Sequence, residues 1–233
     1  MFMKDEWSNK NFAKDWDSHT SQTNPIRQYQ VNILVNVIAT NYRKGESVAD
    51  LGFGSGQVEE MLYKAKPNID IVGIDDSQPM IDLAKKRLGQ NFNRLTVINK
   101  SLEDLSEVVL PQKNYQYIFS VQTLHHLNPE QQKNVFKFVY NSLKPNGVFL
   151  LNDRVGVDFK TFYAEYKVIY ETLKGEEKIK NNLSFDEYLE MINDKQDSPA
   201  KLEEQIQWLT EAGFKVTCLD LIFERALLAA VKI

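Results

Sequence analysis

Between residues 47 and 153, short apolar segments alternate with longer amphipathic ones, and this alternation restricts the fold more than any other feature of the chain. Helical patterns occupy 57–65, 78–88 with Ser77 as a capping residue, and the stretch that Pro129 opens. The short apolar segments between them are expected strands: "SVADLG", "DIVGID", "RLTVINK", "YQYIFSV" and "VFLLND". Strands that alternate with helices in this way predict a doubly wound, mostly parallel sheet with helices on both faces.

The last part of the chain predicts a different connection. The segment "AKLEEQIQWLTEAG" has a helical pattern that ends at Gly213. Two further apolar segments, "FKVTCLDLIFE" and "RALLAAVKI", follow with almost no loop between them. A reversal this tight predicts an antiparallel hairpin at the edge of the sheet.

Two segments lie outside the alternation. Residues 1–24 are polar apart from the aromatic residues Trp7, Phe12 and Trp16, and we expect mobile turns that fold over a ligand. Residues 154–199 have a helical pattern rich in aromatic side chains. We interpret both segments as lids on a single domain of residues 1–233, and a dimer interface or an enlarged core is the alternative for 154–199.

Composition excludes several classes of protein. Cys218 is the only cysteine among 233 residues, which excludes an internal disulfide and a cysteine-rich zinc site. The net charge of −4 and the lack of a basic run count against a nucleic-acid partner. No apolar run approaches the roughly 20 residues of a membrane span, and the N-terminal sequence lacks the apolar centre of a signal peptide. We therefore expect a cytoplasmic protein, as a monomer or a homodimer.

A glycine-rich turn follows the first expected strand. Gly52, Gly54 and Gly56 are spaced G-x-G-x-G, whereas dinucleotide enzymes use G-x-G-x-x-G to receive a pyrophosphate. Asp50 lies two residues before the first glycine, where a carboxylate repels a pyrophosphate and suits an ammonium group. This pattern disfavours a nicotinamide-dependent dehydrogenase, and an ordinary turn remains the alternative to a ligand site.

A second carboxylate closes the second expected strand. Asp75 lies 19 residues after Gly56, where a carboxylate can accept two hydrogen bonds from a ribose diol. The predicted ligand is therefore a nucleoside with a cationic, amino-acid-like tail. S-adenosylmethionine matches that description.

Four segments, in order, carry a family resemblance: "VADLGFGSG", "VGIDDSQPMIDLAKKRL", "YIFSVQTLHHL" followed by "LKPNGVFLLND", and "WLTEAGF" with the final hairpin. Together they resemble the class I S-adenosylmethionine-dependent methyltransferases over most of the chain outside residues 1–24 and 154–199. The resemblance implies a Rossmann-like, mostly parallel seven-stranded sheet with a C-terminal antiparallel hairpin. It also implies S-adenosyl-L-methionine as the cofactor.

The resemblance implies a set of cofactor-binding residues. The three glycines line the methionine moiety, Asp50 lies near its amino group, and Asp75 binds the ribose. Ser101 stands near the position where the family often has an acid for the adenine amino group, so backbone groups or Glu103 are alternatives there. The whole implied set is Asp50, Gly52, Gly54, Gly56, Asp75, Asp76, Met80, Ser101, Leu102 and Ser120, with Asp76 and Met80 beside the adenine.

Four residues at the carboxyl ends of strands are candidates for catalysis. Asp153 and Arg154 follow the fifth strand, and they either face a substrate or form a salt bridge that holds the lid. His125 and His126 follow the fourth strand, and one of them is either a general base or a packed, hydrogen-bonded ring. Without a third ligand nearby in the sequence the histidines make a poor metal site, so we expect no metal.

Methyl transfer from a sulfonium is an in-line displacement that needs alignment more than it needs a catalytic triad. We expect transfer to an O, N or C atom of a small-molecule acceptor. An enzyme of this fold that modifies tRNA or protein is the alternative, although the Asn/Asp-Pro-Pro-Tyr motif for nucleic-acid amines is replaced by "SVQT". A non-catalytic cofactor-binding subunit is the third possibility.

Overall fold

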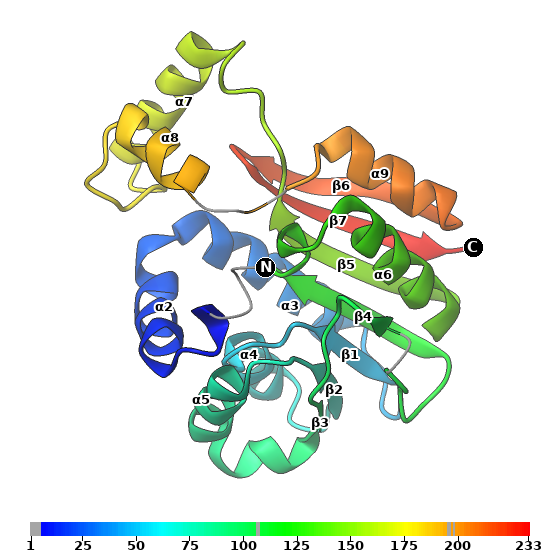
Figure 1. Ribbon diagram of the computed structural model, residues 1–233. Coiled ribbons are helices and arrows are strands. Elements are labelled where there is room, and N and C mark those ends of the chain that lie inside the picture. Colours follow the sequence, from blue (N-terminus) through cyan, green and yellow to red (C-terminus); the bar gives the residue numbers. More distant parts are fainter. Residues whose placement is uncertain (1–5, 106–107, 195–196, 198) are drawn as a thin grey trace.

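The computed structural model describes residues 6–105, 108–194, 197 and 199–233, and its centre is a seven-stranded sheet (Figure 1). The strands lie in the order β3-β2-β1-β4-β5-β7-β6. Strands β1 to β5 pair in parallel, whereas β7 is antiparallel to both β5 and β6. The strands are β1 Val48–Leu51, β2 Ile71–Ile74, β3 Leu95–Ile98, β4 Tyr115–Val121, β5 Leu143–Arg154, β6 Phe214–Ile222 and β7 Arg225–Lys232. This order and these directions confirm the predicted fold class, including the C-terminal hairpin.

Helices cover both faces of the sheet. One apolar cluster joins one face to α3 (Pro25–Asn41), α4 (Gln57–Ala65) and α5 (Gln78–Leu88). The other joins the opposite face to α6 (Pro129–Ser142) and α9 (Leu202–Glu211). Short 3₁₀ helices, η1 (Gly89–Arg94) and η3 (Leu124–His126), follow α5 and β4. With this double cover the loops at the carboxyl ends of the strands remain available for a ligand.

The N-terminal segment differs from the prediction. Residues 10–23 form helix α2 (Lys10–Thr23), not mobile turns. The side chain of Asn9 caps the helix by accepting hydrogen bonds from the backbone N–H groups of Asn11 and Phe12. Trp7 packs edge-to-face against Phe12 and Trp16, with ring centroids 5.1 and 5.5 Å away. Trp7 therefore packs against two aromatic side chains one helical turn apart on α2, and this packing accompanies a helix where turns were predicted.

Residues 154–199 carry α7 (Tyr163–Gly175) and α8 (Phe185–Asp194), which lie apart from the sheet beyond the carboxyl end of β5 (Figure 1). Their aromatic side chains form a cluster of their own around Tyr170, Phe185 and Tyr188, with Phe223 from the turn between β6 and β7. Most of the aromatic residues in this segment thus pack against one another and form the core of the two-helix unit.

Candidate active site

The glycine-rich loop joins β1 to α4, and each of its glycines has a backbone conformation that other residues rarely adopt. The φ angles are +80° at Gly52, +56° at Gly54 and +76° at Gly56. A Cβ at Gly52 would overlap the side chain of Thr123, and one at Gly56 would lie 3.1 Å from the Cβ of Ala84. A Cβ at Gly54 would meet nothing within 4 Å. Gly52 and Gly56 are thus needed for packing, whereas Gly54 leaves open space on the ligand side.

Asp75 connects this loop to the start of α5. Its Oδ2 accepts a hydrogen bond from the N–H of Gly54 at 2.8 Å, and its Oδ1 accepts one from the N–H of Ser77 at 2.9 Å. Burial raises the pKa of the Asp75 carboxyl group to about 6, against the effect of these two N–H groups. The Asp75 carboxylate therefore fixes the glycine-rich loop through Gly54, and it also lines the cavity beside that loop.

A cavity of about 210 Å³ lies against the loop. Most of the residues that the sequence analysis assigned to the cofactor line it: Asp50, Gly52, Gly54, Asp75, Asp76, Met80, Ser101 and Leu102. Gly56 and Ser120 do not. The Ser120 hydroxyl donates to the carbonyl of Leu51 at 2.7 Å and is fully buried, so it ties β4 to β1. The assignment of Ser120 to the cofactor is not matched by this geometry.

Residues from the N-terminal helices close one side of the cavity, and the sequence analysis did not assign them. Trp7, Trp16 and Arg27 line it together with Gln57. The Arg27 guanidinium lies 5.8 Å from the Trp16 ring centroid, and its Nη1 donates to Gln57 Oε1 at 3.0 Å. Burial lowers the pKa of Arg27 to about 10. Three aromatic residues in an otherwise polar stretch were the signal for a covering segment, but nothing in the sequence assigns Arg27.

Asp17 fixes helix α2 against the glycine-rich loop. Its carboxylate accepts hydrogen bonds from Ser55 Oγ at 2.5 Å, Gln57 Nε2 at 2.9 Å and Arg87 Nη2 at 2.6 Å. The carbonyl of Trp7 also accepts a hydrogen bond from Ser77 Oγ at 2.7 Å. Helix α2 is therefore held at the loop after β1, and the segment that precedes it is held at the loop after β2.

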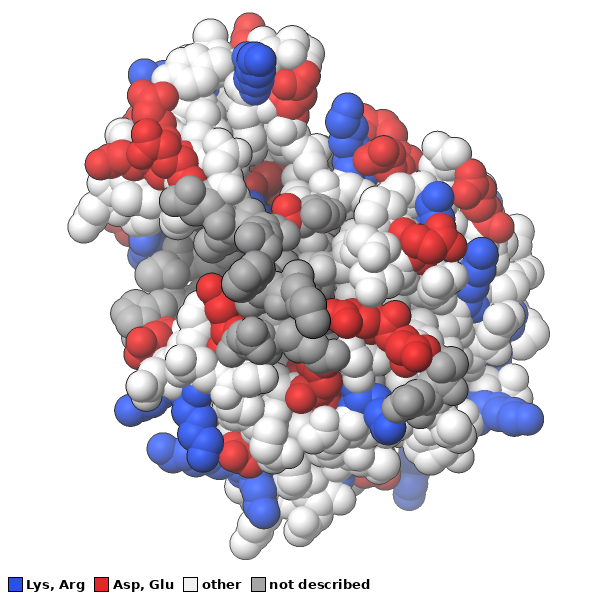
Figure 2. Space-filling view, in the orientation of Figure 1, with Lys and Arg blue, Asp and Glu red and all other residues white. Residues whose placement is uncertain are grey.

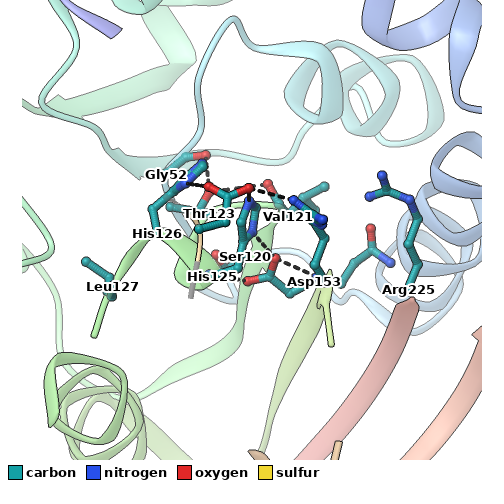
Figure 3. A network of polar contacts seen from close by, with 12 residues as sticks. Gly52, Ser120, Val121, Thr123, His125, His126, Leu127, Asp153 and Arg225 are labelled. Carbon is teal, nitrogen blue, oxygen red and sulfur yellow. Dashed lines mark hydrogen bonds and ion pairs between the residues drawn. The ribbon is translucent and has the colours of Figure 1, made fainter. Parts of the chain in front are cut away.

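The four catalytic candidates belong to one polar network, part of which Figure 3 shows. His125 Nδ1 lies 2.5 Å from Asp153 Oδ1, and the His125 N–H donates to Asp153 Oδ2 at 3.1 Å. Arg154 donates to Asp197 Oδ2 at 2.5 Å and to Glu224 Oε2 at 3.1 Å. Arg154 therefore forms a salt bridge, which was one of its two predicted roles, and it links β5 to Asp197 near the end of the 154–199 segment.

Of the four candidates, only His126 lines the cavity. Its Nδ1 lies 3.0 Å from Asp197 Oδ1, and its ring packs 5.9 Å from that of Trp7. A carboxylate on Nδ1 favours the tautomer that leaves Nε2 as a proton acceptor. Asp197 suits this role: although burial opposes ionisation, the hydrogen bond from His126 and the charges of His125, His126 and Arg154 lower its pKa to about 2.

Asp197 is a third candidate metal ligand beside the two histidines. No third ligand lies near them in the sequence, but the fold supplies one, because single ligand atoms of His125, His126 and Asp197 lie within 4.8 Å of one another. The other oxygen of Asp197 already pairs with the Arg154 guanidinium, whose positive charge opposes a cation at this position. Asp197 lies 71 residues after His126, a separation at which no sequence motif connects them.

Comparison with known proteins agrees with this geometry. A family model described as a methyltransferase domain matches residues 48–147. The chain is 26% identical over 217 residues to the carboxy-S-adenosyl-L-methionine synthase of Nautilia profundicola, covering 87% of this chain and 84% of that protein. The matched domain and the named relatives support the predicted resemblance to the class I S-adenosylmethionine-dependent methyltransferases. S-adenosylmethionine is therefore its cofactor, as the sequence predicted.

Two further comparisons support the family and the fold. The malonyl-[acyl-carrier protein] O-methyltransferase of Priestia megaterium is 27% identical over 157 residues, which cover 67% of this chain and 53% of that protein. The structure of magnesium protoporphyrin IX methyltransferase from Synechocystis PCC 6803 with bound SAH superposes with a TM-score of 0.62 at 16% identity, covering 90% of this chain and 84% of that one. Among the described residues of this methyltransferase, no helix has the length and apolar character to span a membrane.

Proposed function

We propose that this methyltransferase transfers a methyl group from S-adenosylmethionine to an O, N or C atom of a small molecule bound between the cofactor cavity and the lid segment. The observation that carries the proposal is the concave cavity itself, which is lined by the loop after β1, by Asp75 and by Trp7 and Trp16 of the N-terminal segment. A concave site lined by aromatic side chains and a few polar groups is typical of small-molecule binding.

The cavity wall suits the zwitterionic end of the cofactor. Asp50 Oδ1 and Arg27 Nε are buried and have no hydrogen-bond partner among the described residues, and both side chains line the cavity. A buried polar atom without a partner is costly, so ligand groups that pair with both atoms are favoured. We assign the ammonium group of the cofactor to Asp50, its carboxylate to Arg27 and its ribose to Asp75.

The bound cofactor supplies an electrophilic methyl group on a sulfonium. The residues of this chain hold and align the reactants, and orientation of this kind is worth roughly 7–11 kcal/mol. His126, at the cavity wall with Asp197 on its Nδ1, can take a proton at Nε2 from an acceptor that must lose one. Residues 1–24 and 154–199 act as lids that exclude water from the reacting groups. The enzyme works in the cytoplasm as a monomer or a homodimer, and it has no nucleic-acid partner.

The charge distribution supports a small acceptor over RNA. Figure 2 shows Lys and Arg side chains interspersed with Asp and Glu over the visible face. A surface that binds nucleic acid usually carries a continuous basic patch or stripe. RNA and protein therefore enter the test below as alternative acceptors.

A second candidate function is the synthesis of a carboxylated form of the cofactor. The similarity to the synthase of Nautilia profundicola covers 84% of that protein, against 53% for the O-methyltransferase of Priestia megaterium. In this reaction S-adenosylmethionine is the substrate that is modified: its methyl carbon loses a proton and forms a C–C bond to the CO2 that a second, carboxylate-bearing molecule loses, and that molecule takes up a proton in place of its carboxylate. The same cofactor-binding residues serve both candidates.

Mass spectrometry separates these functions. The protein is incubated with S-adenosylmethionine and panels of hydroxy, amino and carboxylic small molecules, unmodified tRNA and protein extracts, with Gly54→Val as the inactive control. Formation of S-adenosylhomocysteine with a methylated small molecule supports the proposal, and a cofactor heavier by one carboxyl group supports the second candidate. Methylation of tRNA or protein alone, or binding without turnover across the whole panel, contradicts the proposal.

A further inference from the structure

Two carboxyl groups lie together under the cofactor cavity. Asp50 is on β1 and is 1% exposed, and Glu59 is in the first turn of α4 and is 0% exposed. They are close enough to share a hydrogen bond once one of them is protonated. As two carboxylates they share none, and Asp50 Oδ1 and both carboxyl oxygens of Glu59 have no hydrogen-bond partner among the described residues.

Two ionised carboxylates in this position would be desolvated and would repel each other. A single proton held between them removes one charge and supplies the missing hydrogen bond, because a protonated carboxyl group is a donor. Such a pair titrates as a unit, not as two independent groups.

The charged neighbours favour retention of that proton. Asp75, from the end of β2, adds a further negative charge near both groups, whereas the guanidinium of Arg27, from α3, acts in the opposite direction on Asp50. The hydroxyl group of Tyr63, one turn along α4, is also buried and has no hydrogen-bond partner among the described residues. Burial first, and then the neighbouring carboxylates, raise the pKa of Asp50 well above its usual range, and burial raises that of Glu59 to about 7.

We propose that Asp50 and Glu59 share one proton in the ligand-free protein, and that binding of the cofactor's ammonium group at Asp50 releases this proton to solvent. This inference rests on the proposed cofactor site and adds Glu59 to it as a positioning residue. No covalent bond to the ligand forms: the carboxyl O–H bond breaks, the proton passes to water or buffer, and the carboxylate that remains pairs with the ammonium group.

The sign of the pH effect follows from this linkage. The cationic ligand lowers the pKa of the pair, so the bound state holds fewer protons than the free state. Affinity therefore rises with pH until the pair is already ionised in the free protein, near pH 7. Release of one proton corresponds to at most about a tenfold gain in affinity per pH unit.

The test uses isothermal titration calorimetry with S-adenosylhomocysteine, which carries the same amino-acid tail. Affinities are measured from pH 5.5 to 8, and proton release is read at pH 6.5 from the difference between two buffers of unlike ionisation enthalpy. The variant is Glu59→Gln, whose amide N–H can donate to Asp50 and so replaces the shared proton. The control is Glu60→Gln, because the neighbouring Glu60 is 35% exposed and pairs with Lys64.

We expect the wild type and Glu60→Gln to release close to one proton at pH 6.5. In Glu59→Gln the repelling carboxylate is gone and an amide N–H can donate to Asp50, so the pKa of Asp50 falls, proton release decreases, and the ligand binds several-fold more tightly than in the wild type at pH 5.5. Tighter binding by Glu59→Gln is informative, because a substitution that only disrupts the structure of the site would weaken binding. The pH dependence that remains in Glu59→Gln belongs to Asp75, whose burial-raised pKa is about 6.

Equal proton release and parallel pH profiles in the wild type and Glu59→Gln would overturn the inference while leaving the cofactor site intact. A wild type that binds no S-adenosylhomocysteine at any pH would instead refute the proposed site. If Glu59→Gln does not fold, ¹³C NMR of glutamate carboxyl groups in the ligand-free wild type gives the answer. One glutamate must titrate near pH 7, and titration of every glutamate close to pH 4.5 contradicts the shared proton.

Discussion

The carboxylate of Asp17 hydrogen-bonds helix α2 to the glycine-rich loop, and Asp17→Asn tests how much the position of the helix depends on it. Asp17 accepts hydrogen bonds from Ser55, Gln57 and Arg87, the last through both carboxylate oxygens at 2.6 and 2.8 Å. Hydrogen bonds to a charged group contribute about 1.5–3 kcal/mol each when buried. The Asp17 and Arg87 side chains are 17% and 25% exposed, so solvent screening reduces this sum. An asparagine keeps one acceptor oxygen, and we expect a net loss of about 2–3 kcal/mol.

The loss is local, because α2 can separate from the loop while the sheet stays folded. A loss of about 2–3 kcal/mol corresponds to amide hydrogen exchange about 30- to 150-fold faster over residues 10–23. Exchange in β1 and β4 should not change. The assay is hydrogen exchange with mass spectrometry, with and without S-adenosylhomocysteine, and the control is Asp15→Asn at an exposed position of the same helix.

Two results would refute the reasoning. Unchanged exchange over residues 10–23 would mean that the aromatic contacts of Trp7 alone hold the helix. Faster exchange throughout the sheet would mean that α2 is part of the folding core and not a separable cover. If α2 is a lid, ligand should slow its exchange in the wild type and do so less in Asp17→Asn.

Three further predictions concern the loop and the buried carboxyl groups. Asp75→Asn should weaken S-adenosylhomocysteine binding by about 10- to 150-fold, because a hydrogen bond to a charged group is worth roughly 1.5–3 kcal/mol. Calorimetry measures the affinity, with Asp82→Asn at an exposed position as the control. Equal affinities of the two variants would contradict the assignment of Asp75 to the ribose. Gly54→Val should abolish binding, because valine is strained at φ +56° and its side chain enters the open space on the ligand side. The circular dichroism of the fold should be kept, because an added Cβ meets no protein atom within 4 Å. Normal binding by this variant would exclude the loop as the part of the chain that holds the cofactor. The free energy of unfolding should fall from pH 4.5 to pH 7, because the folded-state pKa of Glu59 is raised to about 7. The contribution of protonated Glu59 to stability is complete below its unfolded-state pKa and is lost as the pH rises through 7. Denaturant melts should show a smaller fall in Glu59→Gln, and a rise across this range in the wild type would contradict the raised pKa.

Several features of the fold and of the candidate site follow from the sequence alone. The alternation of residues 47–153 specifies the parallel sheet because strand and helix periodicities are local properties of the chain. The spacing of the glycines and the positions of Asp50 and Asp75 at strand ends specify where a nucleoside with a charged tail fits, because carboxyl ends of parallel strands meet at one edge. The near absence of a loop before β7 specifies an antiparallel hairpin.

Other features required the tertiary structure, because they depend on groups far apart in the chain. Asp197 reaches His126 across 71 residues and Asp17 reaches Arg87 across 70, and no periodicity encodes such pairs. The sequence predicted turns before residue 25, whereas edge-to-face packing of Trp7 with Phe12 and Trp16 accompanies a helix there. Glu59 lies in the first turn of α4, an amphipathic helix, and only the packing of α4 against β1 buries it beside Asp50. Local sequence pattern thus determined the sheet and the strand edge where the cofactor binds. Burial and long-range pairing decided the position of Glu59 beside Asp50, the helix that places Trp16 at the cavity, and the carboxylate that orients His126.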